Sequence, residues 1–250
     1  AMIDGQAPVE VFDEIDSTIL EARRRAERNE VSPVWLIAKS QTAGRGRRGR
    51  AWTSHSGNLM ATLLFSTHQP PQQIALLGFA TGVAIAETID AIAGAGTAQL
   101  KWPNDVFING AKVAGIMLDS GSIASGQTWV ALAFGVNLAD APSNIDQKTI
   151  CLRDLLPPDA PAPEPLAFLA SMRPTLEAWS ARMVSEGFEP LRQAWLQRAY
   201  GLGQEARVVQ GEQTLEGRIA GLSSRGELEL DTATGRRLIA AGDVFLPKAA

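Results

Sequence analysis

The stretch VWLIAKSQTAGRGRRGRAWTSHSGNLMATLLF, residues 34–65, decides the fold. Its apolar ends, VWLIAK and NLMATLLF, are rich in strand-forming residues, and each is predicted to be a buried strand. Between them, Gly44, Gly46 and Gly49 match the GxGxxG pattern of a dinucleotide-binding turn. In such a turn a helix begins within the glycines and points its N-terminus at the pyrophosphate, whereas here a strand follows. The stretch therefore predicts a loop between two strands and not a dinucleotide site.

The arginines of this loop allow three interpretations. Arg45, Arg47, Arg48 and Arg50 lie together in a chain with 23 Lys and Arg, 27 Asp and Glu and a net charge of −4. Gly/Arg arms that bind nucleic acid are normally repeated, interleaved with aromatic residues and part of a basic surface, and here Trp52 alone lies close. A solvated loop tip is the ordinary fate of a charge cluster. The third interpretation is a mobile loop that closes its guanidinium groups over the phosphates and carboxylate of an activated ligand.

The first half of the chain predicts alternating strands and helices. A short strand over 9–15 precedes a helix over 17–30, in which Thr18 and Glu21 have the spacing of a capping box. A second helix is predicted over 70–93, where apolar residues recur at helical spacing before a glycine.

Turn residues organise the second half. Asn109-Gly110 is a strong hairpin signal and joins apolar segments that are predicted to be strands, as is the segment 128–138. Two helices follow a proline-rich connection, with Pro174 expected to bend or break the first and Pro190 to begin the second. After residue 200 the chain changes to short alternating segments between glycine-containing turns, which indicates a small antiparallel barrel. We therefore expect domains at 1–200 and 201–250.

The sole cysteine, Cys151, excludes an intramolecular disulfide and a multi-cysteine metal site. The N-terminus lacks a basic segment followed by an apolar run, and no apolar stretch approaches the ~20 residues that cross a bilayer. We expect a soluble, cytoplasmic protein that does not act on a membrane.

Two long motifs carry a family resemblance. KWPNDVFINGAKVAG (101–115), taken with QTAGRGRRGRAW (41–52), closely resembles the biotin protein ligases. IDST (15–18), FGVN (134–137) and AGDVF (241–245) extend the resemblance over nearly the whole chain. It implies an α+β domain with a mixed or antiparallel sheet, like those of class II aminoacyl-tRNA synthetases, and a C-terminal SH3-like barrel. It also implies an enzyme that joins biotin to ATP as biotinyl-5'-AMP and passes the biotinyl group to a lysine of a biotin carboxyl carrier protein.

The resemblance assigns roles to particular residues. The resemblance implies that Lys112 is the central catalytic cation and binds the biotin carboxylate and the α-phosphate. Arg45 and Arg47 are expected to assist it. Other expected contacts to biotin come from polar side chains near the ureido group and from glycines that allow close approach: Ser17, Thr18, Gln41, Gly44, Gly46 and Gly115. Expected contacts to ATP are Arg48, Arg50, Trp52, Lys101, Asn104, Asp105 and Asn137, with Asp105 also proposed to hold Mg²⁺.

Some features depart from the family or leave alternatives open. Ile19 stands where the family often has Asn, Asp119 where it often has Glu, and ALAFGVN replaces a strand end richer in glycine. No DNA-binding domain is expected, and a homodimer is left open. The alternative functions are a lipoate ligase, which has related chemistry and fold, and a non-catalytic nucleic-acid-binding module built on the arginine loop.

Overall fold

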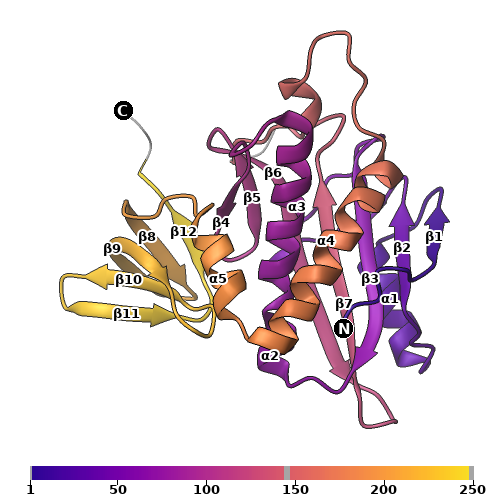
Figure 1. Ribbon diagram of the computed structural model, residues 1–250, viewed down its shortest axis with the longest axis horizontal. Helices are drawn as coiled ribbons and strands as arrows, with labels where there is room; N and C mark the ends of the chain where they lie inside the picture. The colour runs from indigo at the N-terminus through magenta and orange to yellow at the C-terminus, as the bar shows by residue number, and fades with distance from the viewer. Residues whose placement is uncertain (1, 144–146, 248–250) are drawn as a thin grey trace.

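The protein is described by a computed structural model that covers residues 2–143 and 147–247. Its main element is a seven-stranded sheet of order β1-β2-β3-β7-β6-β5-β4 (Figure 1). β1 pairs with β2 in parallel and every other neighbouring pair is antiparallel. The strands are β1 (Val9–Phe12), β2 (Val34–Ala38), β3 (Leu59–Thr67), β4 (Gln99–Lys101), β5 (Asp105–Ile108), β6 (Ala111–Ser122) and β7 (Thr128–Val136).

Helices cover one face of this sheet. α3 (Leu77–Ala93) and α4 (Pro165–Glu186) lie across it, with α2 (Pro71–Ala75) and α5 (Glu189–Leu196) at one end (Figure 1). Alternate residues of the strands point toward them, so that Leu132 of β7 is fully buried. The segment Pro71–Ala93 is long and apolar enough to cross a bilayer, but 72% of its most apolar window is buried within the fold. It is therefore a core helix.

The opposite face is covered at one end by α1 (Thr18–Glu27). Beneath α1 a second apolar cluster forms from Ile19, Leu36, Leu64 and Ala131. α1 does not reach the other end of the strands, and the loop 41–52 lies there instead.

The C-terminal segment forms a five-stranded antiparallel sheet of order β11-β10-β9-β8-β12. Its strands are β8 (Glu205–Gln210), β9 (Gln213–Leu222), β10 (Leu228–Thr232), β11 (Gly235–Ile239) and β12 (Asp243–Phe245).

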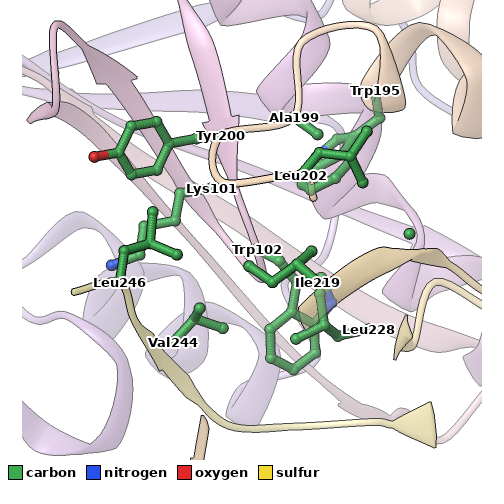
Figure 2. A pocket seen from close by; sticks show the side chains of 11 residues that line it. Lys101, Trp102, Trp195, Ala199, Tyr200, Leu202, Ile219, Leu228, Val244 and Leu246 are labelled. Carbon is green, nitrogen blue, oxygen red and sulfur yellow. The ribbon is translucent and has the colours of Figure 1, made fainter. Parts of the chain in front are cut away.

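The two sheets meet in one continuous apolar core. The Trp102 Nε1 donates a hydrogen bond of 3.0 Å to the carbonyl of Gly226, in the turn between β9 and β10. Figure 2 shows the side chains that line this junction, among them Trp102, Ile219 and Val244. The C-terminal sheet is thus packed directly against β4 and α5.

The α+β class, the mixed sheet and the C-terminal antiparallel sheet are confirmed. So is the hairpin, because Asn109 and Gly110 both have positive φ, 50° and 76°, as the turn requires. Burial raises the pKa of the Cys151 thiol to about 11, which agrees with a cysteine that packs as a small apolar residue. The division at 200/201 stays a prediction.

α4 continues through Pro174 without a break, so of the two predicted effects of this proline only a bend stays a prediction. Two local predictions were wrong. The first strand ends at Phe12, short of the expected residue 15. Thr18 and Glu21 form no capping box, because Ser17 is the N-cap and makes no side-chain cap bond. The Thr18 hydroxyl instead bonds to Gln41 and Thr62, and Glu21 pairs with arginines of its own helix.

Candidate active site

A pocket lies on the sheet face that α1 leaves uncovered. Its volume is about 480 Å³, counting its mouth. The floor comes from β3, β6 and β7, one end from the start of α1, and the roof from the loop 41–52. The lining residues are Ser17, Thr18, Ile19, Gln41, Arg45, Gly46, Arg47, Trp52, Met60, Ala61, Asn104, Lys112, Gly115, Ile116, Met117, Ala133, Phe134 and Gly135.

One end of the pocket is polar and uncharged. The Gln41 Oε1 accepts from the Thr18 backbone N–H at 2.9 Å and from the Thr18 hydroxyl at 3.3 Å. The buried Thr62 hydroxyl donates to Thr18 at 2.8 Å. Because the Thr18 backbone N–H can only donate, the Gln41 Oε1 must face α1, and its amide then donates on the other side to the Ser54 hydroxyl at 3.5 Å.

The floor holds a slot for Trp52. Gly115 and Gly135 are directly opposite on β6 and β7. A Cβ at Gly135 would collide with the Trp52 indole, and one at Gly115 would lie 3.3 Å from it and 3.1 Å from Lys112 Nζ. The space above Gly115, expected to receive the biotin ring, is therefore occupied by Trp52 and Lys112. Because neither glycine has a side chain, the Trp52 indole can pack against the floor of the pocket.

The other end of the pocket is cationic. Lys112 Nζ lies 2.7 Å from the Asp105 carboxylate and 5.7 Å from the Trp52 ring centroid. Arg47 donates to Asn104 Oδ1 at 2.9 Å, and the Asn104 amide in turn donates to the carbonyl of Ile116 at 2.7 Å. Burial lowers the pKa of Arg47 from its usual value. The guanidinium nevertheless stays charged at neutral pH, because arginine is not deprotonated in proteins.

Four of the predicted residues lie just behind this lining. Asp105 pairs with Lys112 from the neighbouring strand. Gly44 accepts a backbone bond from Trp52 at 2.9 Å and has no space for a side chain. Asn137 is buried, and its amide donates to the carbonyl of Ile150 at 3.3 Å. Lys101 stands 5.0 Å above the Phe107 ring, where burial lowers its pKa.

Two predicted residues point elsewhere. Arg48 and Arg50 were expected to meet ATP phosphates, and both instead bind the carboxylate of Asp243 on β12, at 2.8 and 2.5 Å. The loop is thus folded and tied to the C-terminal sheet.

Several lining residues were missed by the sequence analysis. Met60, Met117, Ala133 and Gly135 belong to strands that were predicted, and they lie on the face opposite the helices. The alternation of side chains along a strand was the signal that could have found them, once Gly115 had been placed on that face.

Both parts of the chain match known ligase sequences. Residues 11–137 match the "Biotin/lipoate A/B protein ligase family" and residues 201–246 match the "Biotin protein ligase C terminal domain". The chain is therefore an enzyme of the ligase class. The biotin--[acetyl-CoA-carboxylase] ligase of Paracoccus denitrificans is 36% identical over 233 residues, which are 92% of this chain and 97% of that protein. The chain belongs to the biotin protein ligases.

One further relative supports the family, and one solved structure shares the fold. The biotin--[acetyl-CoA-carboxylase] ligase of Mycobacterium tuberculosis is 30% identical over 88% of this chain and 82% of its own length. The structure of the biotin protein ligase from Aquifex aeolicus in complex with biotin and ATP has a TM-score of 0.78 at 24% identity, and covers 97% of this chain and 99% of that one. The fold is shared along the full length of both chains.

Proposed function

We propose that this enzyme converts biotin and ATP into biotinyl-5'-AMP and then transfers the biotinyl group to a lysine of a biotin carboxyl carrier protein of the acetyl-CoA carboxylase type. The relatives named above act on acetyl-CoA carboxylase. The observation that carries the proposal is a single pocket with an uncharged hydrogen-bonding end and a cationic end. Biotin has the matching polarity, with a neutral ureido group at one end and a carboxylate at the other.

The uncharged end suits the ureido group. Ser17, Thr18 and Gln41 all line this end, and the Gln41 amide, which donates to Ser54 at 3.5 Å, still has a second N–H to offer to a carbonyl oxygen. A buried polar group without a partner is costly, so a ligand that matches these donors gains affinity that an apolar ring system does not. This favours biotin over a lipoyl group, whose ring carries no hydrogen-bonding groups.

The cationic end suits the first reaction step. A biotin carboxylate oxygen attacks the α-phosphorus of ATP, a new O–P bond forms, and the bond to pyrophosphate breaks. Lys112, with Arg45 and Arg47, would stabilise the negative charge shared by the carboxylate and the α-phosphate. Fixed charges of this kind act strongly in a pocket that excludes water. Holding the two anions together is itself worth about 7–11 kcal/mol of the barrier in well-oriented systems.

The second step needs no nucleophile from the enzyme. The carrier lysine, as a free amine, attacks the carbonyl carbon of the anhydride and forms a C–N bond. The C–O bond to the phosphate breaks, AMP leaves with its electron pair, and the nitrogen loses a proton to solvent to give the amide. Lys112 can again neutralise the departing phosphate. Trp52, in its slot over Gly115 and Gly135, would cover the ligand.

Asp105 is the proposed Mg²⁺ ligand. Its Oδ1 is buried and, although paired in charge with Lys112, receives no well-aligned hydrogen bond. Within residues 2–143 and 147–247, no group of three or more His, Cys, Asp and Glu side chains could hold a metal ion. This fits Mg²⁺ bound by one carboxylate together with the ATP phosphates, which is the usual arrangement. The ion would neutralise the charge on the leaving pyrophosphate.

Asn137 and Lys101 complete the proposed contacts to ATP. Lys101 would serve the phosphates, and Asn137 still has a buried Oδ1 without a donor. We also propose that the chain is divided into a catalytic domain at 1–200 and a C-terminal domain at 201–250. We further propose that the enzyme is cytoplasmic and forms a homodimer, which sedimentation can test.

Biotin-dependent exchange of pyrophosphate into ATP tests the proposal. Exchange with biotin, together with biotinyl-5'-AMP by mass spectrometry, is the expected result. Exchange with lipoate and none with biotin would move the assignment to a lipoate ligase. If neither substrate supports exchange and the protein binds single-stranded nucleic acid in a strongly salt-dependent manner, the non-catalytic alternative is correct.

A further inference from the structure

Asp243 is the centre of a charge cluster that joins the arginine loop to the C-terminal sheet. One of its oxygens, Oδ2, binds both Arg48 Nη1 and Arg50 Nη2. Its charge also acts on Arg47 and Lys101, where it opposes the lowering of their pKa values by burial. A single carboxylate of the C-terminal sheet therefore binds two cations of the catalytic domain directly.

The position of Asp243 is fixed by the fold. β12 pairs with β8, with Asp243 opposite Val209. The next residue, Val244, is buried in the pocket between the two sheets (Figure 2). Alternation along the strand therefore turns Asp243 to the opposite side, toward the loop. The carboxylate is therefore carried by a paired strand, with 22% of its side chain exposed.

The loop is bent to reach this carboxylate. Arg48 has φ 56°, in the left-handed region that a residue with a long side chain seldom adopts. The glycines of the loop lose more backbone freedom on ordering than other residues do. Ion pairs at the loop tip offset these costs, and both of the pairs made by Arg48 and Arg50 go to Asp243.

We propose that Asp243 is a positioning residue that keeps the loop 44–51 closed over the pocket whenever pyrophosphate is not there to do so. The inference rests on the proposed function. The polyphosphate of ATP carries more charge than a carboxylate and accepts the same charge-assisted hydrogen bonds from guanidinium groups, so it competes with Asp243 for Arg48 and Arg50. After pyrophosphate leaves, Arg48 and Arg50 bind the Asp243 carboxylate again. The activated biotinyl group then stays shielded from water until the carrier lysine arrives.

The first experiment needs no substrate. Trypsin cleaves after arginine, and cleavage between Arg45 and Arg50 in the ligand-free protein reports how often the loop opens. Asp243→Asn should raise the cleavage rate about twofold to thirtyfold, the range expected for loss of two partly exposed ion pairs. Asp243→Glu should restore slow cleavage. Asp231→Asn is the matched control, because Asp231 pairs with Arg236 on the exposed side of the same sheet.

The second experiment separates positioning from a general loosening of the fold. In Asp243→Asn, biotinyl-5'-AMP formed on the enzyme should dissociate or hydrolyse faster by a similar factor, while the affinity for ATP is unchanged or higher because a competing anion is gone. Weaker ATP binding together with a lower melting temperature would overturn the proposal in favour of a purely structural role. Unchanged cleavage and unchanged adenylate lifetime would also overturn it. If the wild type makes no adenylate, the proposed function fails, and the cleavage experiment still decides whether Asp243 holds the loop.

Discussion

The two faces of the seven-stranded sheet are built from alternate residues of the same strands, but they differ in side-chain size and in what covers them. On β7, Val130 and Leu132 face the helices and are packed in the large core, whereas Ala133 and Gly135 face the pocket. The helix face has large side chains and no space to spare. The pocket face has glycine, alanine and methionine where a ligand and Trp52 must fit. Residues that stabilise the core and residues that line the pocket therefore alternate along the same strands.

The largest expected effect is on the helix face. Leu132→Ala should lower the free energy of unfolding by about 2–5 kcal/mol, because the side chain is fully buried and leaves a cavity. Ala133→Gly, one residue further along on the other face, should cost no more than about 1 kcal/mol. Urea unfolding of both variants measures the difference. Equal losses would show that the pocket face is packed as tightly as the core.

Lys112→Ala tests the cationic end of the pocket face. The rate of adenylate formation should fall about 10²–10³-fold, as for removal of other fixed charges that stabilise a transition state. The affinity for ATP should change much less. Single-turnover kinetics and direct titration give the two quantities. Lys39→Ala removes an equal charge from an exposed site and should leave both unchanged.

A pair of glycine substitutions makes the same chemical change on the pocket face of the sheet and in the helix that covers its other face. In Gly135→Ala the new methyl group collides with Trp52, and biotin affinity should fall by about 1–3 kcal/mol, the usual range for overpacking. Gly78→Ala, in α3 and with open space around it, should raise the free energy of unfolding by about 0.4–1 kcal/mol. Calorimetric titration and thermal unfolding provide the readouts. Unaltered biotin binding by Gly135→Ala would remove Trp52 from the proposed site.

The smallest expected effect is on hydrogen bonds. Thr62→Val removes the hydroxyl that donates to Thr18, which helps to orient Gln41, and should weaken biotin binding by about 0.5–1.5 kcal/mol. Thr88→Val removes a comparable buried hydroxyl within α3 and should leave biotin affinity unaltered. Biotin titration of both proteins is the test. A similar loss in both would mean that Thr62 acts through stability alone.

Local signals predicted much of the fold and part of the site. The hairpin before Lys112 could be predicted because Asn109 and Gly110 tolerate positive φ. The strands around the loop could be predicted because their apolar runs are short and end in polar residues. The residues at the two ends of the pocket could be predicted from the motifs that contain them. Ser17, Thr18 and Gln41 lie at one end and Lys112 at the other.

The remaining features depend on contacts between distant segments. The slot for Trp52 requires Gly115 to lie opposite Gly135, which is a matter of strand register and cannot be read from either strand alone. The capping box failed because the Thr18 hydroxyl is taken by partners on β3 and on the loop. The pairing of Arg48 and Arg50 with Asp243 joins residues about 195 positions apart, for which no local pattern exists.

That separation along the chain has a consequence for synthesis on the ribosome. The loop 44–51 is translated early, and its carboxylate partner follows after about 195 residues, an interval of roughly 10–40 s at ~5–20 residues per second. The strands that form the pocket floor emerge well within this time, whereas β12 is the last strand to leave the exit tunnel. A nascent chain can therefore form the floor of the pocket before Asp243 is available to bind the loop.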